Sequence, residues 1–256
     1  MKKPTFYLTF DDGPYTPATD VVLEVLRTRK PKVLATFFLC SSSNTIKKDT
    51  QWSIIKDIIA EGHALANHGD DHLPYTPGGY RGQVSGKGSM REEERENFAK
   101  DTYGASDVTK HVVKDFEENI VYFENLFKTK SEKFPGFIGS RLPGNGKWRR
   151  SIAEAVVKKT GLPHFGWHVE FAPNGILGHV NQNNWEGVSF AAATIADATR
   201  LQDQHILLLH DSHWAKRKSV LEALVDKLQK LGNFALLSSV LPPTANATFK
   251  QEIVMP

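Results

Sequence analysis

Short apolar runs alternate with amphipathic segments along most of the chain, and this alternation constrains the fold more than any other feature. Each apolar run ends at turn-forming or charged residues, as buried strands do. We expect strands at about 6–10, 35–39, 64–66, 165–169 and 205–209. Apolar residues at helical spacing predict helices at about 17–28, 51–61, 108–128, 151–160, 190–201 and 219–231. The alternation predicts an α/β fold with a parallel sheet, open or closed into a barrel.

One polar segment, 75–107, interrupts this alternation. It is rich in glycine and charge and contains the run REEERE at 91–96. Such a charge run is typical of a solvated surface, so we expect a loop insertion here. The chain has 256 residues and is 40% hydrophobic, which is enough for one large domain. We therefore expect a single domain over 1–256 that carries this insertion.

The charge balance and the apolar pattern limit the partners and the compartment. Thirty-two basic and 29 acidic side chains give a net charge of +3, without a dense basic stripe. We therefore expect no nucleic-acid partner. We also expect a monomer. No apolar stretch approaches the length of a membrane span. The first residues lack the apolar run of a signal peptide, so the protein is either cytoplasmic or has lost an export sequence.

Cys40 is the only cysteine, which excludes an intramolecular disulfide and a C-x-x-C site. Its neighbours Phe37, Phe38 and Leu39 are apolar. This setting predicts a buried structural thiol.

Carboxylates and imidazoles follow two of the predicted strands. Asp11 and Asp12 are adjacent, and such a pair repels unless a cation lies beside it, although the two could also merely cap the next helix. His68 and His72 are separated by three residues, so in a helix or tight turn both imidazoles face one side. One carboxylate and two imidazoles leave a position for water, as in catalytic zinc sites.

Two further polar residues belong to this pattern. Arg141 lies in the loop SRLPGNGKW, where its guanidinium could hold a nearby carboxylate in one orientation or simply face solvent. His210 ends the strongest apolar strand, which indicates either a functional imidazole or a hydrogen-bonded core histidine.

In this order, the pieces resemble the NodB-homology polysaccharide deacetylases, carbohydrate esterase family 4, and most of all the bacterial chitin-oligosaccharide deacetylases. Four motifs of that family are met by TFDDGP at 9–14, His68 with His72, Arg141 with Pro143, and Leu208 with His210. The likeness covers about residues 4–240. It implies a single distorted (β/α) barrel with long inserted loops.

The chain departs from the family pattern at three points. Gly69 lies where the family usually has Ser or Thr, and Gly144 replaces a bulky aromatic residue. In the fourth motif Trp167 is followed by Glu170 in place of Asp, and Trp185 comes only after a long loop. Gly144 and the altered fourth motif keep a carbohydrate-binding pseudoenzyme open as an alternative.

The resemblance implies roles for the motif residues. Asp12, His68 and His72 would hold one divalent ion, which we expect to be zinc, and Asp11 would be the general base, oriented by Arg141.

The remaining roles concern the leaving group and the oxyanion. His210 would be the general acid, kept as the imidazolium by Glu170. A backbone N–H near Gly144 would stabilise the oxyanion.

The implied reaction is N-deacetylation of N-acetylglucosamine units in a glycan of the chitin-oligosaccharide or peptidoglycan type, with release of acetate. Sugar rings stack on aromatic side chains, and we expect Trp185 and Trp214, in polar surroundings, to do so together with Trp167, although core packing is the alternative. A glycan substrate favours a location outside the cytoplasm.

Other functions remain open. An acetylxylan O-deacetylase of the same family fits the motifs. A carbohydrate-binding pseudoenzyme is a further alternative, against which the retained Asp11, Asp12, His68, His72, Arg141 and His210 argue. A phosphatase with an Asp-x-Asp loop does not, because Asp11 and Asp12 are adjacent.

Overall fold

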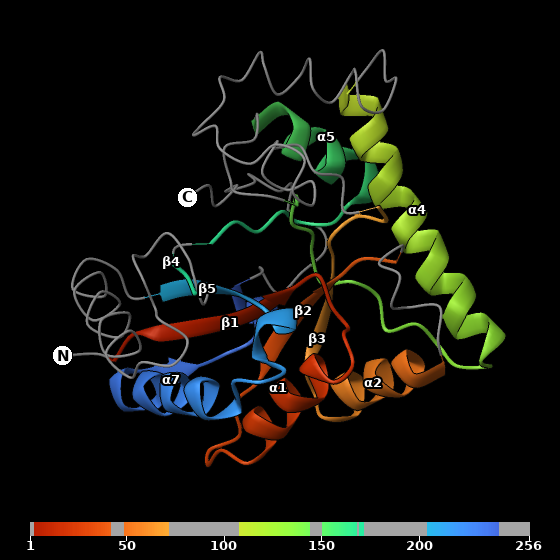
Figure 1. Cartoon of the computed structure of the whole chain (residues 1–256). Helices are drawn as coiled ribbons and strands as arrows, with labels where there is room; N and C mark the ends of the chain where they lie inside the picture. Colours follow the sequence, from red (N-terminus) through yellow and green to blue (C-terminus); the bar gives the residue numbers. More distant parts are fainter. Residues whose placement is uncertain are drawn as a thin grey trace, which may run out of the picture.

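A parallel sheet lies at the centre of the structure, a computed structural model that describes residues 3–41, 49–71, 108–143, 150–167, 169–171 and 204–240 (Figure 1). Its strands are β1 (Thr5–Asp11), β2 (Ala35–Leu39), β3 (Ala64–Asn67), β4 (Val169–Glu170), β5 (Gln204–His210) and β6 (Asn233–Phe234). Their order is β3-β2-β1-β5-β4, and β6 pairs with the start of β1. Every pair among these strands is parallel, which confirms the predicted α/β class.

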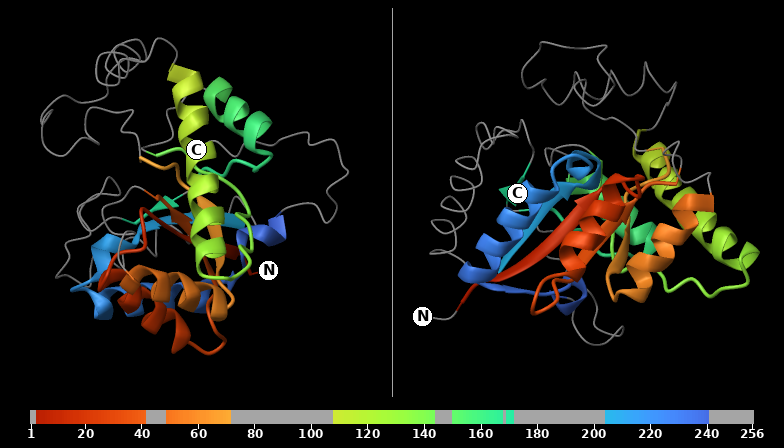
Figure 2. Two further views of the ribbon diagram at one scale, coloured as in Figure 1. Left: turned by 90° about the vertical axis from the view of Figure 1, so that its right-hand side faces the viewer. Right: turned by 60° about the horizontal axis from the view of Figure 1, so that its bottom comes forward.

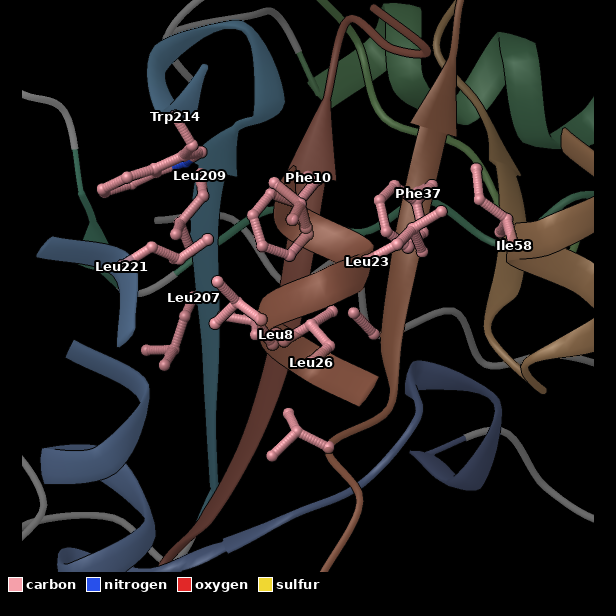
Figure 3. Close-up of a cluster of buried hydrophobic side chains, with 14 of the residues drawn as sticks. Leu8, Phe10, Leu23, Leu26, Phe37, Ile58, Leu207, Leu209, Trp214 and Leu221 are labelled. Carbon is pink, nitrogen blue, oxygen red and sulfur yellow. The ribbon is translucent and has the colours of Figure 1, made fainter. Parts of the chain in front are cut away.

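The central strands are mostly apolar because both faces of the sheet are covered. In the register of β1 and β5, Leu8 lies opposite Leu207, and both belong to one core cluster (Figure 3). The preceding pair, Tyr7 and Ile206, belongs to a second cluster. Since alternate side chains of a strand point to opposite faces, a continuous apolar run is what a sheet buried on both faces requires.

Three helices lie side by side on one face of the sheet, namely α1 (Ala18–Arg27), α2 (Asp49–Ala60) and α7 (Lys218–Leu231) (Figures 1 and 2). Leu23 of α1 and Leu221 of α7 join the same core cluster as Leu8 (Figure 3). A fourth helix, α4 (Val108–Thr129), contacts β3. The helix α5 (Arg150–Thr160) packs against α4. Two short 3-10 helices, η1 (Asp211–Trp214) and η2 (Leu237–Val240), complete the described elements.

The strand order follows the chain order outward from β1 to β3, as in a (β/α) barrel. Beyond β3, single bridge pairs join Asn67 to Ser140 and Ser140 to His164, and both are parallel. Over the described residues the sheet is an open arc, without a pair between His164 and β4. The carboxyl ends of its strands lie along one edge, where polar side chains of parallel sheets gather.

The strand predicted at 165–169 is wrong in its position, because β4 begins only at Val169. The backbone carbonyls of Phe165 and Gly166 accept hydrogen bonds from the side chain of Arg141. Arg141 thus binds these two carbonyls, while the N–H of Phe165 donates to the main-chain oxygen of Ser140 over 2.8 Å.

The other predicted elements in the described part agree with the structure to within one or two residues at each end. The predicted insertion at 75–107 and the predicted helix at 190–201 lie outside the described residues. Within the described helices, none combines the length and the apolar character that a membrane crossing needs.

Candidate metal and active site

Asp11 and Asp12 end the first strand, and the chain turns sharply at this point. Asp11 is the last residue of β1 and is 2% exposed, while Asp12 has a φ of 73°. Neighbouring side chains of a regular strand point to opposite faces, but the left-handed backbone at Asp12, which aspartate tolerates better than most residues, brings both carboxylates to one side. Gly13 is required next, since a Cβ there would lie 2.0 Å from Oδ2 of Asp211.

His68 directly follows β3 and lies beside both carboxylates. Its Nε2 is 3.2 Å from Oδ1 of Asp12 and 3.5 Å from Oδ2 of Asp11. Its Nδ1 is 2.8 Å from the main-chain oxygen of Arg141. A carbonyl oxygen can only accept, so Nδ1 carries a proton, which leaves Nε2 as the ring nitrogen that could bind a metal ion. Metal-binding imidazoles are oriented in this way.

The donor atoms of Asp12 and His68 fit one divalent ion. Two ligands about 2.0–2.2 Å from zinc at a tetrahedral angle are about 3.4 Å apart, close to the 3.2 Å between Oδ1 of Asp12 and Nε2 of His68. The third expected ligand, His72, lies outside the described residues. These residues therefore supply one carboxylate oxygen and one imidazole nitrogen to the site.

Cys40 lies against the same donor pair. Its sulfur and the ligand atoms of Asp12 and His68 are all within 4.8 Å of one another, and the thiol donates to the main-chain oxygen of His68 over 3.4 Å. Burial raises the pKa of the Cys40 thiol well above its ordinary value. The predicted buried thiol is confirmed, and it forms part of the wall of the site.

Arg141 is 1% exposed and is bound on all sides of its guanidinium. Nη1 donates to Oδ1 of Asp11 over 2.7 Å and to Oγ1 of Thr9 over 2.8 Å. Nε and Nη2 donate to the main-chain oxygens of Phe165 and Gly166, each over 3.0 Å. Because these hydrogen bonds fix the guanidinium of Arg141, it holds Oδ1 of Asp11 in a single direction.

His210 is the last residue of β5 and lies opposite Asp11 in the register of the two strands. Its Nε2 is 4.0 Å from Oδ2 of Asp12, and its ring centroid is 5.1 Å from that of His213. Burial, followed by the neighbouring His210, lowers the pKa of His213 to about 4, so this second imidazole is neutral. The site thus combines two carboxylates, a buried guanidinium and three imidazoles.

A family model described as polysaccharide deacetylase matches residues 1–131, which include β1 and both motif histidines. The chain belongs to the polysaccharide deacetylase family. The resemblance read from the motifs is confirmed.

Known members of the polysaccharide deacetylase family support this placement. Over 69 residues the chain is 42% identical to a chitooligosaccharide deacetylase of Sinorhizobium fredii (strain NBRC 101917 / NGR234). The match covers 27% of this chain and 29% of the relative, so less than a third of that protein is spanned.

Solved structures share the fold over most of the chain. The chitin deacetylase of the fungal pathogen Colletotrichum lindemuthianum superposes with a TM-score of 0.61 at 18% identity, over 96% of this chain and 91% of that one. A family 4 acetyl xylan esterase of Clostridium thermocellum in complex with a cobalt ion gives 0.55 at 20% identity, over 92% and 89%. At these identities the likeness shows the fold, and it confirms the NodB-type α/β fold expected from the motifs.

Two of the tryptophans expected to bind sugar, Trp167 and Trp214, are buried in the described part of the chain. Trp214 is 3% exposed and packs in the core with Leu209 and Leu221 (Figure 3), so its predicted polar surroundings are wrong. The cause is η1, which turns the ring inward onto α7 although its sequence neighbours are polar. Trp167 is also buried, with its ring centroid 5.7 Å from Cζ of Arg141.

Three other predicted site residues cannot be placed in this geometry. Gly144, Trp185 and the side chain of Glu170 lie outside the described part, although the backbone of Glu170 pairs with Leu208 in β5.

The sequence reasoning missed two residues that the fold brings to the site, Thr9 and His213. Thr9 accepts from Arg141 and donates to the main-chain oxygen of Leu207 over 2.8 Å. For His213 the available signal was its spacing of three from His210, because a 3-10 helix has about three residues per turn.

Proposed function

We propose that this chain is a metal-dependent N-deacetylase that hydrolyses the acetamide of N-acetylglucosamine units in a glycan of the chitin-oligosaccharide or peptidoglycan type and releases acetate. One observation carries the proposal: a buried carboxylate, Asp11, is held by Arg141 next to the donor pair of Asp12 and His68. The relative from Sinorhizobium fredii is named for this chemistry on chitooligosaccharides.

Zinc is the ion proposed for the site, with Asp12, His68 and His72 as its ligands. When bound, a divalent ion lowers the pKa of a coordinated water and polarises a carbonyl group. The protein's part is to hold an imidazole and a carboxylate at a fixed separation. The hydrogen bond from Nδ1 of His68 to the main-chain oxygen of Arg141 orients the imidazole for this role.

Asp11 is the proposed general base, which takes a proton from the attacking water. Its Oδ1 is bound to Arg141, while Oδ2 lies on the side of His68. Arg141 therefore orients the base without filling the side from which a proton would come. Removing either partner of this buried pair would leave an uncompensated charge, which is strongly destabilising.

His210 is the proposed general acid, which delivers a proton to the leaving nitrogen and must therefore be an imidazolium. It is partly exposed and lies 4.0 Å from Oδ2 of Asp12. The neutral imidazole of His213 lies beside it, and Glu170 is the further carboxylate proposed to stabilise its charge. A backbone N–H near Gly144 is proposed to bind the developing oxyanion.

The proposed setting is a glycan outside the cytoplasm, bound by a monomer in a single domain over 1–256. Since Trp167 and Trp214 are buried, Trp185 is the aromatic residue proposed to stack on a sugar. An acetylxylan O-deacetylase is the second candidate, because an acetyl xylan esterase shares the fold. A carbohydrate-binding pseudoenzyme is the third.

A panel of substrates distinguishes these functions. The full chain is loaded with zinc and incubated with chitin oligosaccharides, muropeptides and acetylated xylan, and acetate release is measured with mass spectrometry of the products. We expect acetate from an N-acetylated glycan, abolished by a chelator and restored by zinc. Release from xylan alone would support the second candidate. No release from any substrate by a zinc-loaded, folded protein would contradict the proposal.

A further inference from the structure

The backbone at Gly69 leaves no room for a side chain. Its φ is +84°, and a Cβ there would lie 2.2 Å from Oδ2 and 3.4 Å from Cγ of Asp115, a residue of α4. Real Cβ atoms do not approach a neighbour as closely as 2.2 Å. The carboxylate of Asp115 therefore occupies the space that a side chain at position 69 would fill.

Asp115 also binds the backbone that follows Gly69. Its Oδ1 accepts from the N–H of Asp71 over 2.8 Å, and its main-chain oxygen accepts from the N–H of Asp70 over 3.2 Å. Two successive amides, both between His68 and His72 in the sequence, are thus held by one residue of a distant helix. The side chain of Asp70 is held separately, because the hydroxyl of Ser41 donates a hydrogen bond to its carboxylate.

Burying the carboxyl group of Asp115 destabilises the folded state, so packing alone does not explain an aspartate at this position. Asp115 is 4% exposed, and its Oδ2 has no hydrogen-bond partner among the described residues. Burial raises the pKa of Asp115 to about 7, which shows how poorly the charge is accommodated. A leucine of similar shape would remove the burial penalty on this carboxylate. What leucine would lose is the acceptor for Asp71.

We propose that Asp115 is a positioning residue for the metal site: it fills the space left by Gly69 and fixes the backbone of Asp70 and Asp71, and so sets the segment that joins His68 to His72. The proposal rests on the function proposed above, because it takes these two histidines as ligands. Partners that orient metal ligands from outside contribute about 10–100-fold to metal affinity in other sites. Asp115 acts here through two backbone amides.

Zinc affinity of the metal-stripped full chain, measured by competition with a chromophoric chelator, tests this role. Asp115→Leu should bind zinc about 10–100-fold more weakly than the wild type, and its thermal midpoint in the absence of metal shows whether the variant is folded. Asp115→Asn keeps the acceptor for Asp71 and should stay within about threefold. Glu118→Leu, the same type of change at a half-exposed acid on α4, is the matched control and should not change the affinity.

Two results would overturn the proposal. One is an unchanged zinc affinity in Asp115→Leu, and the other is an equal loss in Asp115→Asn, which would indicate a role of charge and not of the acceptor. If the wild type itself takes up no zinc, the proposed function fails. Hydrogen exchange of the backbone amides then tests whether Asp115 positions this segment. Faster exchange of the segment 69–71 in Asp115→Leu supports the positioning role, and unchanged exchange contradicts it.

Discussion

At the scale of single residues, Asp11 has its two oxygens in different surroundings, with Oδ1 on Arg141 and Oδ2 toward His68. Asp11→Asn keeps the size of the side chain but removes the base. We expect turnover to fall by about 10²–10⁴-fold, the range for general acid–base groups. Zinc affinity should stay within a few-fold, because Asp12 and His68 are unchanged. A near-wild-type rate at saturating zinc, measured by acetate release, would show that another group takes the proton.

His210 gives a second residue-scale prediction. His210→Ala should lower kcat by about 10²–10⁴-fold and leave zinc affinity nearly unchanged. The reason is that His210 is 4.0 Å from the nearer oxygen of Asp12 and is assigned to the leaving group. His213→Ala is the comparison, and it should retain more activity. An effect of less than about tenfold for His210→Ala would point to water as the proton donor.

Arg141 gives a third prediction, on stability. Arg141→Ala leaves the buried Asp11 without its cation and removes four hydrogen bonds from the guanidinium. Losing one partner of a buried pair costs about 3–5 kcal/mol of unfolding free energy. Arg27→Ala, which breaks the more exposed pair with Glu61, should cost at most about 1 kcal/mol. Urea unfolding of the two variants checks this, and equal losses would contradict a structural role for the buried pair.

The residues at the site were predicted from the sequence where a motif marks them. Asp11, Asp12, His68 and Arg141 are close together in the structure, and the motifs named all four. Trp214 was misread because polar neighbours say nothing of the direction in which a 3-10 helix turns a ring. Asp115 could not be found, since no local pattern reveals that a residue of α4 will meet Gly69.

At the scale of elements, His63 joins the end of α2 to the start of β2. Its Nδ1 accepts from the N–H of Ala35 over 3.1 Å, and burial lowers its pKa from 6.5 to about 4. Because the pKa is lower in the folded state, the unfolded chain binds the proton more tightly between pH 6.5 and 4. Stability is therefore lost as the pH falls through this window, by about 2 kcal/mol between pH 7 and pH 5.

The variant His63→Asn isolates this contribution, because asparagine keeps an acceptor for Ala35 but does not titrate. Urea unfolding of both proteins at pH 7 and pH 5 gives the difference. We expect the wild type to lose about 2 kcal/mol more than the variant over this range. Parallel losses in the two proteins would show that His63 is not the titrating group.

Elements were easier to predict than their pairing. The runs that became β1, β2 and β5 are short and mostly apolar, so their length and composition identified them. The stretch before β4 was misplaced because its carbonyls bind Arg141, a contact across the fold that no local pattern contains. The bridge pairs at Ser140 and His164 each involve a single residue on either side, which produces no strand pattern in the sequence.

At the scale of the whole molecule, the sheet brings segments far apart in the sequence to one edge. β1 delivers Asp11 and Asp12, β3 leads into His68, and β5 ends at His210. Parallel pairing of these strands is what makes the three ends meet. The account therefore depends on a metal site shared between the first and the third strand.

Zinc titration into the metal-stripped full chain, followed by calorimetry, tests this dependence most directly in the wild type, His68→Ala and Asp12→Asn. The account predicts one zinc per wild-type chain and a loss of affinity of more than about 100-fold in each variant, beyond the range seen for residues outside the ligand shell. A wild-type chain that takes up no zinc, or variants that bind it as tightly as the wild type, would contradict the account.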